Sequence, residues 1–389
     1  MKISYGKQYI DKADKVAVTK ALSSDFITQG KYVENFETEL KKLFKSKYVC
    51  AVSSGTAGMH LIAKALNWGK NDIILMSAVT FVSTANIVEH LGAKLDLIDI
   101  DEITYNIDID KLEKKIKFYK SQKKNVKAVV ATDYAGLPCE WKKLKQLSDN
   151  YSFKIINDNC HAIGAEYNGK ISYGAKYAIA SIHSYHPVKN ITTGEGGAIF
   201  TDNKEIYYKV KKLRSHGIEK RGKDNIPWYY DISSIGFNYR INDFQCALGI
   251  SQLNKLNKFL KKRRYVANYY FQRLKNLKFL KLPQAKYNRN HSYHLFPVQI
   301  NFNKIKLNKK NFFLFFKKKN ISLQVHYIPI YRLTYYKKKY NFLKKNFPNS
   351  EKFYKSVVSL PIFYTIKENQ LNKIINLIKG IKKNSVSKF

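Results

Sequence analysis

Residues 126–160 read VKAVVATDYAGLPCEWKKLKQLSDNYSFKIINDNC. The first part, VKAVVATDYAG (126–136), and the last part, FKIINDNC (153–160), are short apolar runs that predict strands buried on both faces. The stretch between them, EWKKLKQLSDN (140–150), has the apolar spacing of a helix. Buried strands separated by a helix indicate a parallel sheet with helices packed against it.

The same alternation runs through the first 200 residues. Further strands are predicted at KYVCAVSS (47–54), DIILMSAVTF (72–81) and AKLDLIDID (93–101), and helices at GTAGMHLIAKAL (55–66) and STANIVEHL (83–91). The predicted fold class is therefore α/β, a large domain with a mostly parallel central sheet covered by helices.

The end of the chain has a different character. A long amphipathic helix is predicted from about 253 to 275, followed by strand-like pieces at HLFPVQINF (294–302) and ISLQVHYIPIY (321–331). Helical segments lie between and after these pieces, which indicates a smaller α+β domain. We expect residues 1–250 to form the large domain and residues 251–389 the small C-terminal domain.

The charge of the chain is strongly positive. Among 389 residues, 70 lysines and arginines face 29 acids, a net charge of +41, which suggests nucleic acid, an anionic membrane face or an acidic substrate. Only 8 of the basic residues are arginine, and the lysines are scattered among Asn, Ile, Tyr and Phe. Compositional bias is the favoured explanation over nucleic-acid binding. The lysine runs at 317–319 and 337–339 are expected to be solvated.

Several classes of protein are disfavoured by local sequence. The four cysteines (Cys50, Cys139, Cys160, Cys246) are far apart, which argues against a zinc site or a disulfide framework and fits a reducing cytoplasm. The N-terminal residues lack the apolar core of a signal peptide, and no window approaches 18 uninterrupted apolar residues. We therefore expect a cytoplasmic protein with no metal and no membrane partner.

Candidate site residues fall where the predicted strands end, which is where open parallel sheets bind ligands. SSGTAG (53–58) stands before a helix and suits either a phosphate or an ordinary N-cap. Asp158 either caps a turn or pairs with a protonated ring nitrogen, and His161 is either a packed histidine or part of the same site. Asn238 and Arg240, before another helix, either form a turn or reach a ligand or a neighbouring subunit.

Lys189 lies in SYHPVKNITTGEGG (184–197) and has three alternative interpretations. It is a solvated loop lysine, a phosphate binder, or a covalent catalyst that forms an imine with an aldehyde. The turn at 53–58, Asp158 and Lys189 are more specific together than each is alone. A phosphate-binding turn, an acid about 100 residues later and a lysine before a glycine-rich turn describe a pyridoxal phosphate site.

Five stretches carry a resemblance to a known family. They are SSGTAGMHL (53–61), DNCHAIGAEYNGK (158–170), SYHPVKNITTGEGGAIFTD (184–202), RSHGI (214–218) and IGFNYRINDFQCALG (235–249). In this order they resemble the DegT/DnrJ/EryC1/StrS sugar-nucleotide aminotransferase family, a branch of the fold-type I pyridoxal phosphate enzymes. The similarity runs from about residue 4 to 365.

The resemblance implies roles for individual residues. Lys189 matches the catalytic lysine that binds the cofactor aldehyde, Asp158 the partner of the ring nitrogen, and Phe81 the aromatic residue that stacks on the ring. His161 is expected beside the cofactor. The phosphate of the cofactor is expected at Gly55, Thr56 and Ser184. Asn238 is expected to come from the opposite subunit. The residues expected to contact the sugar nucleotide are Tyr5, Asp25, Phe26, Ile27, Thr28, Ser54, Ser184, Asn238, Gln324, Val325, His326 and Tyr327.

Within the family, SYGKQYIDKAD (4–14), SDFITQGKYVENFE (24–37) and LQVHYIPIY (323–331) resemble the branch that acts in pseudaminic acid synthesis. That branch implies a UDP-linked 4-keto-6-deoxy-N-acetylhexosamine as acceptor and L-glutamate as amino donor, with pyridoxal phosphate alternating with pyridoxamine phosphate. It also implies a homodimer with shared active sites. A dTDP- or GDP-linked keto sugar is the alternative acceptor, and a non-catalytic or nucleic-acid-binding protein is the alternative class.

Some positions depart from the family pattern. Asn157 and Asn159 flank Asp158 where Glu and Ala are commoner, and Gly58 and Cys246 stand for Ala. None of these changes removes a reactive group. Family members without the lysine act as dehydratases, so the presence of Lys189 favours transamination.

Overall fold

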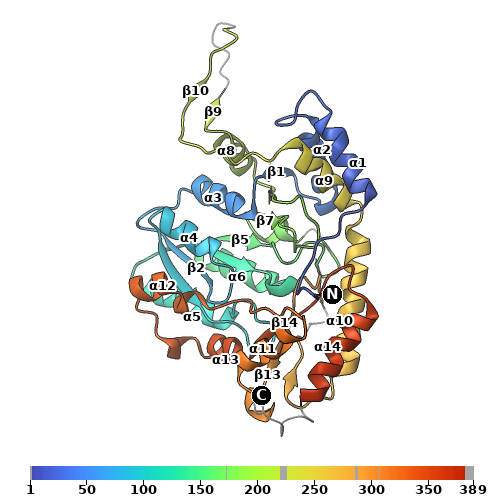
Figure 1. Cartoon of the computed structure of the whole chain (residues 1–389). Helices are drawn as coiled ribbons and strands as arrows, with labels where there is room; N and C mark the ends of the chain where they lie inside the picture. The colour runs from blue at the N-terminus through green and yellow to red at the C-terminus, as the bar shows by residue number, and fades with distance from the viewer. Residues whose placement is uncertain (1, 172, 220–225, 285–287, 306, 382–389) are drawn as a thin grey trace.

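The computed structural model describes residues 2–171, 173–219, 226–284, 288–305 and 307–381. Its centre is a seven-stranded sheet in the order β1-β8-β7-β5-β4-β2-β3 (Figure 1). Strand β8 is antiparallel to both neighbours, and the other pairs are parallel. The predicted mostly parallel sheet is confirmed. In sheet order the strands are Tyr48–Val52, Gly197–Thr201, Ala180–Ser184, Lys154–Asp158, Val126–Thr132, Ile73–Ser77 and Lys94–Ile98.

Alternate residues of the central strands pack into two different cores. On β2, Ile74 and Met76 belong to the core that includes helices α3 (Gly55–Ala65) and α4 (Ser83–His90). Ile73 and Leu75 belong to the core beneath α5 (Ile109–Ser121) and α6 (Trp141–Tyr151). Since side chains alternate along a strand, both faces of the sheet are apolar and each is covered by helices.

The C-terminal part has a core of its own around a three-stranded antiparallel sheet, β11-β13-β14 (Leu280–Lys281, Phe296–Ile300, Val357–Leu360). Helices α10 (Leu256–Leu274), α11 (Lys309–Lys318) and α14 (Glu368–Ile381) pack around it. Two segments cross between the cores: Ile3 packs in the C-terminal core, and Tyr331 packs in a core of the large sheet. The boundary at 250/251 falls inside α9 (Asp243–Leu253) and stays a prediction.

The remaining elements are short or peripheral. The helices are α1 (Lys12–Leu22), α2 (Lys31–Phe44), α7 (Gly174–Tyr177), α8 (Lys204–Arg214), α12 (Thr334–Lys339) and α13 (Pro348–Ser356), and the strands are β6 (Glu166–Tyr167), β9 (Ile218–Glu219), β10 (Asp231–Ile232) and β12 (Arg289–Asn290). The lysine runs at 317–319 and 337–339 are exposed, as predicted.

One prediction of secondary structure was wrong. The segment 321–331 is not a strand: Ile321 and Gln324 form only isolated bridges, and a 3-10 turn begins at Ile330. Pro329 lacks a backbone donor, and side chains hold the segment instead, with Ser359 Oγ 2.9 Å from His326 Nδ1. The long helix predicted from about 253 to 275 is confirmed as α10, which begins at Leu256, just after α9 ends at Leu253.

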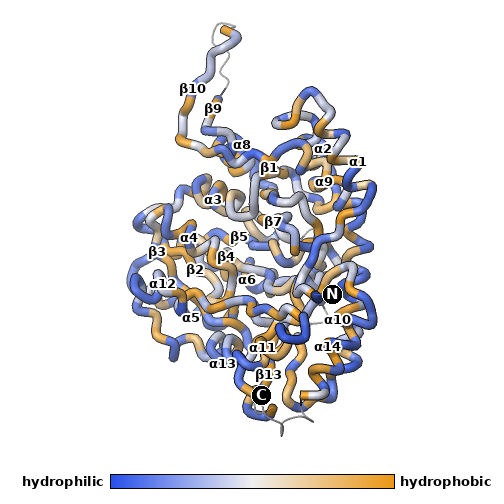
Figure 2. The backbone as a smooth tube through the Cα atoms, viewed as in Figure 1, coloured by the Kyte–Doolittle hydropathy of each residue, from blue (hydrophilic) through white to orange (hydrophobic). Residues whose placement is uncertain are grey.

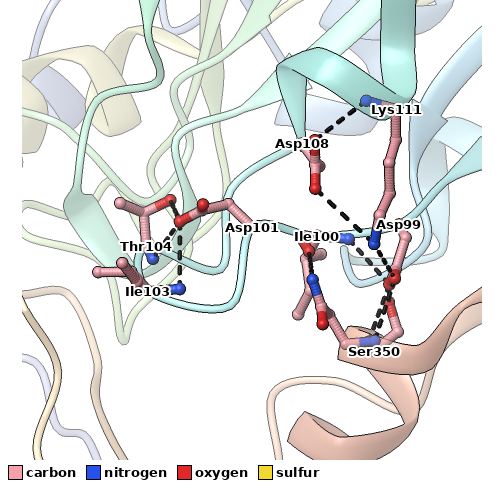
Figure 3. Close-up of polar contacts among 9 residues, drawn as sticks. Asp99, Ile100, Asp101, Ile103, Thr104, Asp108, Lys111 and Ser350 are labelled. Carbon is pink, nitrogen blue, oxygen red and sulfur yellow. Dashed lines mark hydrogen bonds and ion pairs between the residues drawn. The ribbon is translucent and has the colours of Figure 1, made fainter. Parts of the chain in front are cut away.

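The carboxylate of Asp99 fixes the C-terminal part to the large sheet (Figure 3). It accepts hydrogen bonds from the N–H groups of Asn349 (3.0 Å) and Ser350 (2.8 Å) in the first turn of α13, and from Lys111 Nζ (2.7 Å). An acid at a helix N-terminus is favoured by the helix dipole. Burial alone would raise the pKa of Asp99. The hydrogen bonds from Lys111 and Ser350 outweigh burial, so the pKa of Asp99 is lowered.

A hairpin of β9 and β10 projects away from the rest of the chain (Figure 1), and apolar stretches alternate with polar ones along it (Figure 2). The exposed apolar side chains in its described part are Ile218, Ile226, Trp228, Tyr229, Tyr230, Ile232 and Ile235. Exposed apolar side chains gathered on one projecting segment are typical of an interaction surface.

Three further findings concern helix length, metal-binding side chains and cysteines. No helix in the described ranges is both long and apolar enough to cross a bilayer. Those residues also contain no group of three or more His, Cys, Asp or Glu side chains placed to hold a metal ion. All four cysteines are free thiols.

Candidate active site

Three segments meet at the carboxyl edge of the central sheet. Asp158 is the last residue of β5, Ser184 is the last residue of β7, and Gly55 begins α3 after β1. A Cβ atom added to Gly55 would lie 3.0 Å from Cβ of Ser184 and 3.2 Å from Sγ of Cys160. The turn predicted to bind phosphate is therefore adjacent to the ends of two strands. They are β5, which ends at Asp158, and β7, which precedes Lys189.

The first turn of α3 offers two backbone donors. Oγ of Ser54 caps the helix by accepting a hydrogen bond from the N–H of Ala57 (3.0 Å). The N–H groups of Gly55 and Thr56 donate to no acceptor within the described residues. Free donors at the positive end of a helix bind anions such as phosphate. Gly197 permits this close approach, because a Cβ there would lie 2.6 Å from the carbonyl carbon of Ser54.

Asp158 is a nearly buried carboxylate, with 7% of its surface exposed. Oδ1 accepts a hydrogen bond from the N–H of Cys160 (3.1 Å), and Thr132 Oγ1 lies 3.4 Å from Oδ2. Asp158 forms no ion pair with the side chains that the structure describes. A buried carboxylate costs free energy unless it is paired, so this position suits a ligand with a positively charged group.

Lys189 lies in the loop after β7, where its backbone N–H donates to the carbonyl of His186 (2.9 Å). Burial lowers the pKa of its amine, and the side chains of Cys160 and Asp158 oppose the shift. A lower pKa increases the neutral fraction of the amine, which is the nucleophilic and basic form. The electrostatic interaction with Asp158 places the predicted lysine and the predicted acid in one site.

His161, Tyr327 and Phe81 form a wall of this site. His161 Nδ1 lies 3.3 Å from the N–H of Ala135, and its Nε2 lies 2.8 Å from Oη of Tyr327. Burial, together with the charge of Lys189, lowers the pKa of His161 well below its usual value, so the ring is neutral and Nε2–H donates to Tyr327. The ring of Phe81 lies 5.8 Å from that of Tyr327 and is 53% exposed, leaving a free aromatic face.

Five of the twelve residues predicted to contact the sugar nucleotide, Tyr5 and Gln324 to Tyr327, belong to this wall or lie beside it. The rings of Tyr5 and His326 are 5.3 Å apart, and the carbonyl of Tyr5 accepts a hydrogen bond from the N–H of Ile362 (3.0 Å). The segment from Gln324 to Tyr327, including Val325, is tied to the wall by the bond between Tyr327 and His161. The N-terminal and C-terminal parts of the chain therefore meet at the edge of the large sheet.

Two sets of predicted site residues lie apart from Lys189 and Asp158 within one chain. Asp25, Phe26, Ile27 and Thr28 are exposed in the turn between α1 and α2, and the carbonyl of Ile27 accepts a bond from the N–H of Asp243 (2.9 Å). Asn238 is exposed, and its backbone pairs with Ser215. Neither group makes a hydrogen bond or ion pair with Lys189 or Asp158 in the described part of the chain.

Sequence reasoning missed two residues of the site. Tyr134 Oη donates to the carbonyl of His326, and Asp133 is fully buried beside the strand that ends in Asp158. Both directly follow β4, just as Asp158 ends β5. An acid after a buried strand was the signal that pointed to Asp158, and the same signal was present at Asp133.

The geometry fits pyridoxal phosphate. The first turn of α3 suits its phosphate, the buried Asp158 suits a protonated ring nitrogen, and Phe81 presents a face to the ring. The amine of Lys189, with its lowered pKa, suits its aldehyde.

Comparison with known proteins identifies the chain. The family model described as the DegT/DnrJ/EryC1/StrS aminotransferase family matches residues 8–379. A Campylobacter jejuni protein named UDP-4-amino-4,6-dideoxy-N-acetyl-beta-L-altrosamine transaminase is 37% identical over 359 residues, which cover 92% of each chain. The solved structure of Helicobacter pylori PseC, an aminotransferase involved in the biosynthesis of pseudoaminic acid, is 31% identical with a TM-score of 0.90, covering 98% of this chain and 100% of that one.

A sugar aminotransferase from Streptococcus pneumoniae, described as putative and solved in its pyridoxal phosphate form, has the same fold at 23% identity. Its TM-score is 0.88, and the match covers 100% of both chains. The chain belongs to the DegT/DnrJ/EryC1/StrS aminotransferase family and is a pyridoxal phosphate-dependent sugar aminotransferase.

Proposed function

We propose that this enzyme moves the amino group of L-glutamate to C4 of a UDP-linked 4-keto-6-deoxy-N-acetylhexosamine. The observation that carries the proposal is the placement of the segment from Gln324 to Tyr327 beside the candidate cofactor site, through the bond between Tyr327 and His161. The names of the Campylobacter and Helicobacter relatives support the same substrate class. The strongly positive charge of the chain favours association with a sugar diphosphate.

Lys189 is the proposed catalytic residue. Pyridoxal phosphate, when bound, supplies an aldehyde that takes up amino groups and a ring that accepts the electrons released when a substrate proton leaves. The amine of Lys189 anchors that aldehyde and, once released and neutral, accepts the proton from the substrate carbon and returns it as general base and acid. Burial supports this role, because it lowers the pKa of the amine.

Three other groups are proposed to bind and orient the cofactor. Asp158 keeps the ring nitrogen protonated, because a nearby negative charge favours the charged form. The N–H groups of Gly55 and Thr56, with Ser184, hold the phosphate. Phe81 packs on the cofactor ring. His161 is neutral because its pKa is lowered, so it places no second positive charge beside the protonated ring nitrogen.

The active form is proposed to be a homodimer with shared sites. Trp228 and Ile235 on the hairpin of β9 and β10 are 81% and 83% exposed, which is costly for large apolar side chains in a monomer. Asn238 follows this hairpin, and in Figure 1 the turn carrying Asp25 to Thr28 lies at the same end of the molecule. A second copy covering this end would bring both groups to the site of its partner.

The enzyme is proposed to act in the cytoplasm, where its four free thiols persist. A substrate panel tests the proposed reaction. Purified holoenzyme with L-glutamate is offered UDP-, dTDP- and GDP-linked 4-keto-6-deoxy sugars, and the products are identified by NMR. We expect amination at C4 of the UDP-linked N-acetyl sugar, with at least about tenfold higher kcat/KM, or roughly 1.4 kcal/mol of discrimination. A preference for a dTDP- or GDP-linked sugar would refute the proposed substrate and leave the aminotransferase class intact.

A further inference from the structure

The buried carboxylate of Asp133 contacts both residues that flank Asp158. Its Oδ2 accepts hydrogen bonds from Nδ2 of Asn157 (2.9 Å) and from Nδ2 of Asn159 (2.9 Å). Tyr173 Oη donates to the same oxygen (2.8 Å), and the N–H of Cys139 donates to Oδ1 (2.7 Å). Asp133 is 0% exposed, so these four donors replace the solvation that its charge would have in water.

The hydrogen bonds of Asp133 to Asn157 and Asn159 lie on the face of the sheet opposite to the one that Asp158 faces. Successive side chains of a strand point to opposite faces, so Asn157 and Asn159 point away from the side that Asp158 faces. The backbone N–H of Asp133 also donates to the carbonyl of Asp158 (3.1 Å). One residue, directly after β4, therefore contacts the chain at position 158 and at the positions before and after it.

The network also fixes the orientation of the amides. Oδ1 of Asn157 accepts a hydrogen bond from Oγ of Ser181 (2.9 Å), which leaves Nδ2 to donate to Asp133. Ser181 lies on β7, the strand that ends at Ser184. The hydrogen bonds thus join the three adjacent strands that lead to Asp133, Asp158 and Ser184.

Asp133 itself does not belong to the reacting groups. It makes no hydrogen bond or ion pair with Lys189 or with the side chain of Asp158 among the described residues. No basic side chain pairs with it there, so its charge is balanced by neutral donors alone. An ordinary stabilising residue would be held by a cation, or would be apolar, at lower cost in free energy.

We propose that Asp133 is a positioning residue that holds the carboxylate of Asp158 toward the ring nitrogen through Asn157 and Asn159. The proposal rests on the role proposed above for Asp158. A displacement of about 1 Å at a group that orients a reaction lowers rates by roughly a hundredfold. In Asp133→Asn one of the two accepting oxygens becomes an NH2 donor, although donors face both oxygens of Asp133. The hydrogen bonds that hold Asn157 and Asn159 are then weakened, and the side chain of Asp158 is less firmly positioned.

The test is Asp133→Asn in the holoenzyme, with two readouts. The first is the pH at which the absorbance of the bound cofactor changes, which depends on the charge at the ring nitrogen. We expect it to move in the same direction as in Asp158→Asn, by a smaller amount. The second is steady-state kinetics, in which we expect kcat to fall roughly tenfold to a hundredfold with KM for glutamate changed less than about threefold.

Control variants separate positioning from stability. Asp96→Asn changes another buried carboxylate (8% exposed), on the edge strand β3. Asp96 accepts a hydrogen bond from Tyr119 of α5 and pairs with Lys115 (3.0 Å), so this variant should lower only the melting temperature. Tyr173→Phe removes a donor to Asp133 and the hydroxyl to which Asn159 Nδ2 also donates (2.6 Å), but both asparagines keep their bonds to Asp133. It should therefore shift the spectroscopic pH profile less than Asp133→Asn does. If Asp133→Asn does not fold, Asn159→Ala removes one of the two contacts and should shift the profile partially.

A double variant decides whether Asp133 acts through Asp158. In Asp158→Asn, adding Asp133→Asn should cause no further change in the spectroscopic pH profile and less than about a twofold change in kcat. A wild-type profile in Asp133→Asn, or independent effects that multiply in the double variant, would overturn the proposal. Lys189→Ala is measured in parallel, because retention of the wild-type cofactor spectrum in that variant would refute the proposed site rather than the role of Asp133.

Discussion

Replacement of Gly197 by alanine tests the geometry of the phosphate site without changing any polar group. The new Cβ would lie 2.6 Å from the carbonyl carbon of Ser54 and 2.7 Å from the backbone nitrogen of Gly55. Nonbonded carbons settle at about 3.5–4.0 Å, so the start of α3 has to move by about 1 Å. The obstacle is backbone, which cannot rotate away as a flexible side chain can.

The size of the effect follows from what that movement costs. Overpacking of a core position costs about 1–3 kcal/mol of the free energy of unfolding. Hydrogen bonds to a charged group contribute about 1.5–3 kcal/mol each, so misplacing one N–H donor should weaken cofactor binding roughly tenfold to a hundredfold. We expect Gly197→Ala to lower the melting temperature of the apoenzyme and to raise the Kd for pyridoxal phosphate in a spectroscopic titration.

Gly58, which lies in α3 itself, provides a matched control. A Cβ there would lie 3.4 Å from Cγ1 of Ile199, which is ordinary contact. Because alanine stabilises a helix interior by about 0.5–1 kcal/mol relative to glycine, Gly58→Ala should raise the melting temperature and leave the Kd for the cofactor unchanged. If Gly197→Ala matches the wild type in both measurements, α3 is not held where the structure places it and the argument for a phosphate site fails.

The remaining predictions concern the cofactor, pH and assembly. Lys189→Ala should lose the absorbance of the covalently held cofactor and multiple-turnover transfer, and full turnover would reject its assignment. Asp158→Asn should still bind pyridoxal phosphate but lose at least about a hundredfold in kcat; a wild-type rate would refute the ring-nitrogen argument. Burial raises the pKa of Asp133 to about 6, so the folded state binds its proton more tightly than the unfolded state. The stability of the wild type relative to Asp133→Asn should therefore fall by about 2 kcal/mol as pH rises from 4 to 7, measured by urea unfolding. A difference in stability that does not change with pH would contradict the raised pKa of Asp133. Trp228→Ser with Ile235→Ser should shift the enzyme from dimer to monomer in sedimentation without lowering its melting temperature by more than a few degrees, and an unchanged dimer would exclude the hairpin from the interface.

Five of the seven strands of the large sheet were predicted from short, mostly apolar runs, whereas β7, which reads ASIHS, and β8 were not predicted. Residues 126–132 and 154–158 are buried on both faces, and only a sheet covered on both sides accommodates such runs. The segment 321–331 has a similar composition, but it is a loop. Its conformation depends on contacts of His326 with Ser359 and with Tyr134, which lie far away in the sequence.

Part of the candidate site could be predicted residue by residue. Lys189, Asp158 and Gly55 were predicted from their motifs, and the structure brings them to one edge of the sheet. Asp133 was not predicted, because its partners Asn157 and Asn159 become neighbours only when β4 and β5 pair. The turn from Asp25 to Thr28 and Asn238 stay predictions, because one chain does not bring them to Lys189.

The sequence by itself determined the class of fold and the chemistry that the chain can perform, since apolar periodicity and the reactive side chains are local properties. The tertiary structure decided which groups are buried, and burial sets their charge. Lys189 has a lowered pKa and His161 is neutral because neighbouring strands and the C-terminal segment exclude water from them. Desolvation arises from residues that are distant along the chain, so no motif encodes it.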